Sequence, residues 1–425
     1  MDDYFVNNTM PDCFFKPLFD LYPLSDDQYD CHSLSDLEYA QMGVERCISA
    51  SDSGNGFLQT YQKEDGSSVG VGHFFEALKS PRRLKNLTSL NDFMRPYIAD
   101  HLDDPLAEIE ELKKWHFYAA DGHYQKAAIF DPKIKADLSK AEPSKSATGH
   151  FFMLDLRTHH LGYLDLAQPE DGKKSEHDMK VLKRQSFQDL RNGAKKGEKV
   201  FYFWDRASID FGYWKDAKHQ AGVYFATLAK SNTATTKIRD LNIIDYSDKR
   251  NEGIQYDRLV STSEGYEIRE ILYKNPADGV EYKYLTSELS LPAWVIILLY
   301  KHRWDVEKVF DELKTKCGEK RSWASSVEAK KAHAIFLCLT HNLMLLTEKH
   351  MTTVEGLEDV VEKKKSIIRK RPAHPTTKEP KISFINGFFK RATQRTARFI
   401  RWLRNALSKR LPYGDAVTQL AKIWG

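Results

Sequence analysis

The chain has 425 residues, of which 41% are hydrophobic and 29% are charged, with a formal net charge of +4. This length is enough to bury a sizeable core and suggests two to four domains. Five cysteines without a Cys-x-x-Cys pair exclude a disulfide framework and a zinc site and are typical of reduced intracellular thiols. The acidic first residues and the short apolar run at 292–300 exclude a signal peptide and a membrane span, so we expect a cytoplasmic protein.

The N-terminal part of the chain is expected to be mostly helical. Residues 1–50 are acidic and irregular, and the segment 32–50 is either a short helix or part of a floppy tail. Residues 72–112 have helical periodicity and contain a small basic cluster at 82–85.

From residue 114 onward, short apolar segments alternate with helical ones, which indicates a mixed α/β sheet. In chain order we expect a strand at 114–124, a hairpin at 149–167, a helix at 177–193, a strand at 199–207, a helix through about 220 and a strand at 222–230. Two of these strands stop at an aspartate, Asp121 and Asp205.

The pattern changes after this sheet. Residues 231–289 are polar with alternating segments, which predicts a small β-rich insertion. The sequence YKHRWDVEKVFDELK at 300–314 then predicts a helix, and residues 329–350 predict a second, longer one.

The helix at 300–314 aligns four polar side chains. At about 100° per residue they fall within about 60° of one another on the helical wheel; they are Tyr300, Arg303, Glu307 and Lys314. Taken alone, such a strip is more often a solvated face with i,i+4 ion pairs.

Three carboxylates from separate elements could meet at one edge of the sheet. An acid at the carboxyl end of a buried strand points into the crevice where α/β sheets hold their chemistry, which applies to Asp121 and Asp205. Glu307 follows on the helix after the last strand. Without cations the three would repel one another. Two Mg²⁺ ions about 4 Å apart would neutralise them and support phosphodiester chemistry.

These residues resemble a known family. The spacing Tyr-x2-Arg-x3-Glu-x6-Lys resembles the C-terminal signature of the bacterial insertion-sequence DDE transposases of the Y-R-E-K type. YAADGHY at 118–124 resembles their first catalytic block, WDRA at 204–207 the second, and residues 149–178 the hairpin and the His-Asp that follow the first block. The resemblance covers about residues 70–350.

The resemblance implies a fold and a division of the chain. It implies a ribonuclease-H-like catalytic core in two parts, 113–230 and 290–350, interrupted by the β-rich insertion at 231–289. The core would be flanked by a DNA-end-binding N-terminal region, 1–112, and a basic C-terminal region, 351–425.

The resemblance also implies an activity. Asp121, Asp205 and Glu307 would be the catalytic residues and would hold two Mg²⁺ ions, for which Mn²⁺ can substitute. The reaction would be cleavage at insertion-sequence ends and strand transfer into target DNA. The partners would be double-stranded DNA, as terminal repeats and target, and a second copy of the chain in a synaptic complex, in a bacterial cytoplasm near the nucleoid and away from membranes.

The remaining members of the strip would contact DNA. Arg303 and Lys314 are expected on phosphates, since Arg offers a fork and Lys a point charge. Tyr300 is expected on a phosphate or a sugar. Trp304 either stacks on an extruded base or is half-buried against the insertion.

Other polar residues compete for these roles. Asp155 also ends a strand and is the alternative first catalytic acid, although the family carries a non-catalytic Asp in that strand. Asp178 is expected to begin a helix, and His159 and His160 are expected at a surface turn.

The C-terminal region is strongly basic. Residues 363–410 contain sixteen Lys or Arg and one acid, so the residues before them are net acidic. Residues 388–411 predict a basic amphipathic helix that binds phosphates, with a membrane surface as the alternative, after a charged linker at 363–381.

Two other functions remain open. His123 and Arg206 depart from the usual family residues, so one alternative is an inactive, transposase-derived DNA-binding protein. The other is a stand-alone nuclease with a related core.

Overall fold

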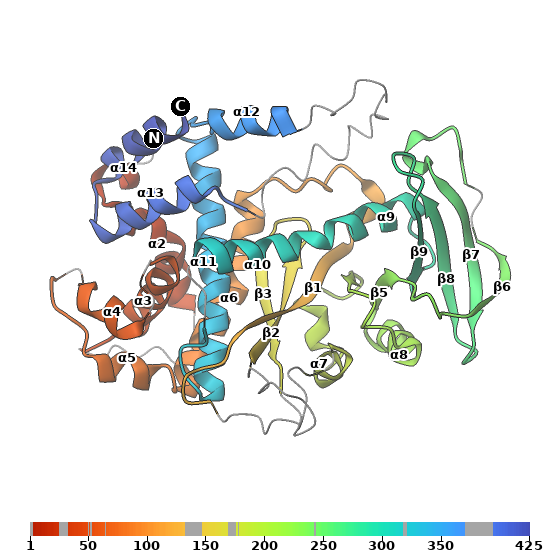
Figure 1. The fold of residues 1–425 in the computed structure, drawn as a ribbon, viewed down its shortest axis with the longest axis horizontal. Helices are drawn as coiled ribbons and strands as arrows, with labels where there is room; N and C mark the ends of the chain where they lie inside the picture. Colours follow the sequence, from red (N-terminus) through yellow and green to blue (C-terminus); the bar gives the residue numbers. More distant parts are fainter. Residues whose placement is uncertain are drawn as a thin grey trace, which may run out of the picture.

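A nine-stranded sheet in the order β3-β2-β1-β4-β5-β9-β8-β7-β6 crosses the molecule (Figure 1). The computed structural model describes residues 3–24, 33–49, 51, 53–63, 65–131, 147–168, 176, 178–241, 244–317, 321–369 and 394–425. The strands are β1 Trp115–Lys126, β2 Ala147–Asp155, β3 Leu161–Leu166, β4 Lys199–Phe203, β5 Val223–Leu228, β6 Thr235–Asp240, β7 Ile254–Thr262, β8 Glu267–Lys274 and β9 Glu281–Thr286.

Fourteen α-helices accompany the sheet within the described ranges. They are α1 Asp3–Asn7, α2 Met10–Leu21, α3 Asp36–Ile48, α4 Gly54–Thr60, α5 Val71–Ala77, α6 Pro81–His101, α7 Asp178–Arg184, α8 Phe211–Ala221, α9 Ala293–His302, α10 Trp304–Lys316, α11 Val327–Thr353, α12 Val360–Arg369, α13 Ala397–Ser408 and α14 Tyr413–Trp424. The prediction of a mixed α/β fold is therefore confirmed. None of these helices is long and apolar enough to cross a membrane.

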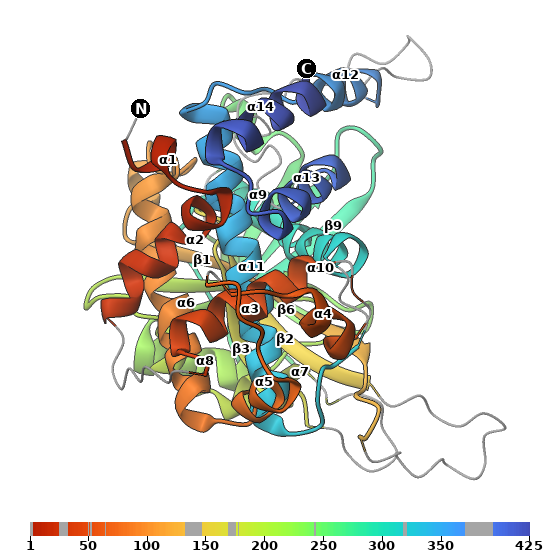
Figure 2. The same cartoon turned by 90° about the vertical axis from the view of Figure 1, so that its left-hand side faces the viewer.

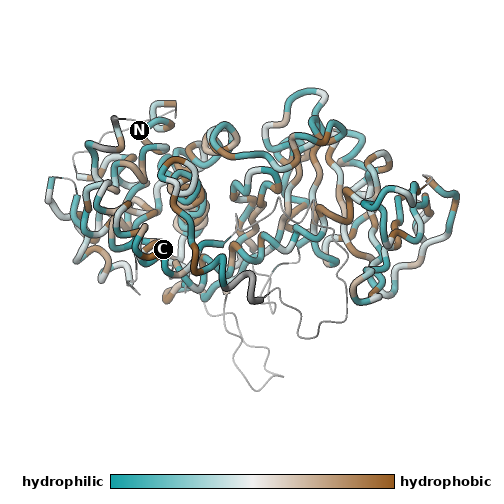
Figure 3. The backbone as a smooth tube through the Cα atoms, turned by 90° about the horizontal axis from the view of Figure 1, so that it is seen from above, coloured by the Kyte–Doolittle hydropathy of each residue, from teal (hydrophilic) through white to brown (hydrophobic). Residues whose placement is uncertain are grey.

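The first five strands form a half-sheet that is buried on both faces. β1, β4 and β5 are parallel, β2 pairs antiparallel with β1, and β3 pairs antiparallel with β2. Successive side chains of a strand point to opposite faces, so Phe117 and Ala119 join the core that contains α9 to α11, whereas Tyr118 and Ala120 join the core that contains α7 and α8. Brown, hydrophobic segments run through these strands, and many peripheral loops are teal (Figure 3).

The predicted β-rich insertion is present as β6 to β9 and continues the same sheet. β9 pairs antiparallel with β5, with Ala226 opposite Thr286, and β8, β7 and β6 follow antiparallel. Because the ladder is continuous, the insertion extends the core sheet directly.

The N-terminal segment differs from its prediction. Residues 1–50 were expected to be irregular, with either a short helix or a floppy tail at 32–50. Helices α1 and α2 form in the first part, where α2 buries Phe14, Phe15 and Leu18, and α3 corresponds to the helical alternative. Ser35 and Glu38 cap α3 reciprocally, a signature visible in the sequence. Packing on α6 and α11 stabilises α2 and α3, and α1 packs on α14; the composition of these short helices alone would not stabilise them.

The C-terminal helices pack onto this N-terminal bundle. Figure 2 shows α13 and α14, in blue, beside α1 and α2, in red. The amide of Met10 donates to the carbonyl of Leu411 at 2.7 Å, and the amide of Tyr413 donates to the carbonyl of Asn8 at 3.1 Å. Part of the predicted basic helix at 388–411 lies outside the described residues, and its described part, α13, is a packed helix whose Phe399 and other apolar side chains are buried.

Candidate active site

Asp121 lies in β1, and Asp205 lies two residues beyond the end of β4, the neighbouring parallel strand. β1 and β4 pair with Ala119 opposite Phe203, and two residues further along each segment are Asp121 and Asp205. The strand prediction was wrong at one point, since β1 continues past Asp121 to Lys126. That continuation no longer pairs with β4, which has already ended, but it stays paired with β2, and Lys126 also forms a parallel bridge with Arg321.

Glu307 approaches the same region on α10, which packs against β1. The opposite, apolar stripe of α10 fixes the helix, because Val306, Val309 and Leu313 are fully buried and such side chains contribute roughly 1.5–3 kcal/mol each. Glu307 itself keeps 30% of its side chain exposed.

The predicted single helix at 300–314 is wrong, because it is broken at Arg303 into α9 and α10. The amide of Arg303 donates to the carbonyl of Tyr300, three residues back, at 3.1 Å. Asp305 then receives a bond from His302 Nδ1 at 2.8 Å in the first turn of α10, where an acid is favoured. Arg303 thus lies at the junction of the two helices.

Arg303 joins two of the three predicted acids. Its Nη1 donates to Asp121 Oδ2 at 3.3 Å, and its Nη2 donates to Glu307 Oε1 at 3.0 Å. The guanidinium is 11% exposed and lies between carboxylates that come from β1 and α10. Arg303 and Glu307 follow Asp121 by 182 and 186 positions in the sequence, so folding brings these distant residues together.

The pKa of Asp121 depends on burial and on the charged residues around it. Burial raises the pKa of Asp121 to about 6, with Glu307 and Asp205 adding to the rise and Arg303 and the Gly122 amide opposing it. Both other acids therefore lie close enough to act on Asp121 through the low-dielectric interior. The positive charge of Arg303 alone does not compensate the negative charge of ionised Asp121 beside its acidic neighbours.

A fourth acid belongs to this group, Asp178, for which the sequence analysis predicted only a helix start. Asp178 begins α7, as predicted. Burial, together with the charges of Asp205 and Asp121, raises its pKa to about 7. The available signal was its place at the start of the first helix after the β2–β3 hairpin, at the sheet edge that carries the other acids.

The donor chemistry of the site fits divalent cations. Carboxylate oxygens are the ligands that Mg²⁺ prefers, and Asp121, Asp205 and Glu307 are the residues that could hold such ions. Over the described residues, no three His, Cys, Asp or Glu side chains are already grouped closely enough to hold a metal ion. Arg303 instead provides the neutralising charge between Asp121 and Glu307.

The predicted DNA contacts differ in accessibility. Tyr300 is only 9% exposed and packs edge-on against Phe203 and Tyr284, at ring distances of 6.4 and 5.4 Å. Trp304 is 56% exposed, with the Arg303 guanidinium 5.8 Å from its ring. Lys314 is exposed on α10, about two turns beyond Glu307.

The competing acid Asp155 has a local structural role. Its Oδ1 accepts the amides of Arg157 at 2.7 Å and Thr158 at 3.3 Å, which stabilises the turn between β2 and β3. The prediction that His159 and His160 lie at a surface turn is wrong, since both are buried. Helices α6 and α11 cover the turn, and the sequence of a hairpin alone does not reveal that cover.

Residues 145–343 match the family model for the transposase DDE domain. The matched range contains Asp205 and Glu307 and begins after Asp121. None of the curated proteins compared with the chain matches it. Among solved structures, a piggyBac transposase synaptic complex with hairpin DNA is similar with 13% identity and a TM-score of 0.38, over 96% of this chain and 86% of that one. The match of residues 145–343 supports a DDE transposase.

Proposed function

We propose that the chain is a transposase that cleaves DNA at the ends of a bacterial insertion sequence and joins the cut strand to target DNA. The observation that carries this proposal is the contact of Arg303 with both Asp121 and Glu307, beside Asp205. Glu307 and Asp205 also lie in the range that matches the transposase DDE domain.

Asp121, Asp205 and Glu307 would hold two Mg²⁺ ions, or Mn²⁺ in their place. Such ions, when bound, activate an attacking hydroxyl and stabilise the leaving oxygen of a phosphodiester. The raised pKa of Asp121 means that this residue must lose its proton to act as a ligand.

The basic and aromatic side chains beside the acids would hold the DNA strand. Arg303, once released from the carboxylates, can offer its two-pronged donor to a phosphate, and exposed Lys314 can add a point charge. Exposed Trp304 can stack on an unpaired base at the cut end. Residues 1–112 would recognise the terminal repeats, and two copies of the chain would form the synaptic complex.

The direct test uses Glu307→Gln with labelled DNA that carries the inverted repeats flanking the reading frame. We expect cleavage in Mg²⁺ to fall by at least about 10²-fold, the scale on which loss of one charge-stabilising group acts, while DNA affinity stays within about twofold. Asp311→Asn, an exposed acid on the same helix, is the matched control and should cleave normally. Cleavage by Glu307→Gln at the wild-type rate would remove Glu307 from the site.

A second assay separates the alternatives. A pre-cut end with a free 3′-hydroxyl is supplied with target DNA, and joined products are counted. Joining supports a transposase, cleavage without joining supports a nuclease, and binding without either reaction supports an inactive DNA-binding protein.

A further inference from the structure

The face of α10 that points away from Asp121 is held by a buried ion pair with the C-terminal segment. Arg395 Nη1 donates to Glu312 Oε1 at 2.8 Å, and the side chains of both residues are 0% exposed. The backbone amide of Arg395 donates to the second oxygen, Glu312 Oε2. Both carboxylate oxygens are therefore engaged by one residue that lies far away in the sequence.

The same C-terminal segment also forms hydrogen bonds with residues of α10 on either side of Glu312. Gln394 Nε2 donates to the carbonyl of Lys308 at 2.8 Å, and Lys316 Nζ donates to the carbonyl of Arg395 at 2.7 Å. Arg404 Nη2 donates to the carbonyl of Lys316 at 3.0 Å. These bonds span Lys308 to Lys316, the stretch that directly follows Glu307.

The pair is also tied to the core sheet. Arg395 Nη1 lies 3.2 Å from His341 Nδ1 on α11, and His341 Nε2 lies 3.0 Å from the carbonyl of His159 in the β2–β3 turn. Burial acts to raise the pKa of Glu312, but Arg395 and His341 outweigh it, so the pKa lies below the ordinary value. Glu312 is thus an ionised carboxylate that depends on its partners.

We propose that Arg395 is a positioning residue of the active site, whose buried pair with Glu312 sets the rotation and height of α10 so that Glu307 meets Asp121. The apolar stripe holds α10 against the sheet, and the engagement of both oxygens of Glu312 by Arg395 adds a directional constraint on the rotation of the helix. This inference rests on the proposed cation site at Asp121, Asp205 and Glu307. It assigns the C-terminal region an action on the site from behind α10, in place of the predicted contact with phosphates.

Arg398, in the same segment, provides a matched control. Arg398 makes an ion pair with Asp359 at 2.7 Å and donates to the carbonyl of Ile423 at 3.3 Å. These partners lie outside α10. Loss of Arg398 therefore removes a comparable internal contact of the same segment without touching the helix that carries Glu307.

The test measures Mn²⁺ binding to the full chain without DNA, by titration calorimetry or by electron paramagnetic resonance of the free ion. We expect Arg395→Met to weaken Mn²⁺ binding by about tenfold or more and Arg398→Met to leave it within twofold. Arg395→Lys should recover part of the loss, because Lys can still reach Glu312. Equal affinities in Arg395→Met and Arg398→Met would overturn the proposal.

Removal of one partner of a buried pair leaves an uncompensated charge, so Arg395→Met risks unfolding. The double variant Glu312→Leu/Arg395→Met removes both charges and keeps the volume, a change that buried pairs often tolerate. If it folds with weakened Mn²⁺ binding, the positioning role stands, and wild-type affinity in this variant would refute it. The proposed function requires the wild type to bind Mn²⁺ and Glu307→Gln to lose that binding. Absence of such binding in the wild type would instead refute the proposed function.

Discussion

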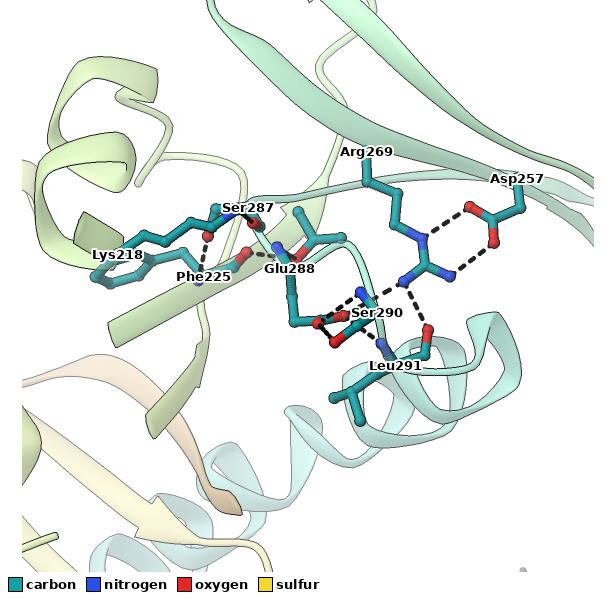
Figure 4. Close-up of polar contacts among 9 residues, drawn as sticks. Lys218, Phe225, Asp257, Arg269, Ser287, Glu288, Ser290 and Leu291 are labelled. Atoms are coloured by element: carbon teal, nitrogen blue, oxygen red, sulfur yellow. Dashed lines mark hydrogen bonds and ion pairs between the residues drawn. The ribbon is translucent and has the colours of Figure 1, made fainter. Parts of the chain in front are cut away.

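Two clusters in this molecule place one guanidinium between two carboxylates, and they differ in how completely they are closed. Arg269 lies between Asp257 and Glu288 where the insertion meets the start of α9 (Figure 4), with side-chain exposures of 0%, 1% and 2%. Arg303 lies between Asp121 and Glu307, with exposures of 11%, 20% and 30%.

In the closed cluster, formed by Arg269, Asp257 and Glu288, the charged groups are fully hydrogen-bonded. Arg269 binds Asp257 through two bonds of 2.7 Å and donates to the carbonyl of Leu291 at 2.7 Å. Glu288 accepts the amides of Ser290 at 2.7 Å and Leu291 at 2.8 Å. Such saturation fixes the insertion to α9 and leaves no room for a ligand.

In the open cluster, formed by Arg303, Asp121 and Glu307, the positive charge of Arg303 does not fully compensate the two carboxylates. One bond joins Arg303 to each carboxylate, and the pKa of Asp121 stays raised in spite of Arg303. The same three side-chain types therefore stabilise the fold when they are buried and fully hydrogen-bonded, and offer a site for cations when they are exposed and short of positive charge.

The largest expected effect breaks the closed cluster. Arg269→Met leaves Asp257 and Glu288 buried without their cation, so we expect the free energy of unfolding to fall by about 3–5 kcal/mol. Urea denaturation followed by circular dichroism measures this. Arg250→Met, which removes a half-exposed ion pair with Asp248, should cost less than about 1 kcal/mol. Equal losses in the two variants would contradict the distinction.

The second prediction has the opposite sign. Because the folded-state pKa of Asp121 is about 6 against an ordinary 3.8, the folded protein holds this proton more tightly than the unfolded chain. Stability should therefore fall as pH rises from about 4 to about 6 and stay lower above that range. We expect Asp121→Asn to be more stable than wild type at pH 7.5, by about 2 kcal/mol.

This gain should disappear near pH 3.5, where Asp121 is protonated in both the folded and the unfolded state. Paired urea titrations of wild type and variant at the two pH values measure the difference. A loss of stability at pH 7.5 would place Asp121 with the closed cluster. Asp257→Asn, tested alongside, should destabilise the protein at this pH, because its partner Arg269 is sealed from water.

The smallest effect sharpens the comparison from the DNA side. Trp304 stands exposed beside the open cluster, so Trp304→Ala should change the free energy of unfolding by less than about 0.5 kcal/mol. We expect it to weaken binding to an end with unpaired bases by at least about 1 kcal/mol, the contribution of one stacked base. Fluorescence anisotropy with frayed and fully paired ends measures this, and equal loss on both would argue against stacking.

Much of the sheet could be predicted because its periodicity is local. The hairpin, the insertion and the strands that carry Asp121 or precede Asp205 follow from alternating apolar residues and turn signals. The proximity of these two acids follows from the parallel register of β1 and β4.

The remaining features depend on contacts between distant segments. The break at Arg303 retains helical backbone angles, so no glycine or proline marks it. The burial of His159 is due to α11, and the role of Arg395 is due to Glu312 on another helix. The helix predicted at 177–193 is shorter in the structure, with α7 ending at Arg184.

The backbone bonds between α2 and residues 411–413 have a consequence for biosynthesis. The helix that carries Phe14, Phe15 and Leu18 is bonded at its start to a partner that leaves the ribosome nearly four hundred codons later. We therefore expect nascent chains to expose an aromatic surface for most of translation and to require chaperone protection. Products shortened before residue 411 would keep that surface exposed and become substrates for quality-control proteases.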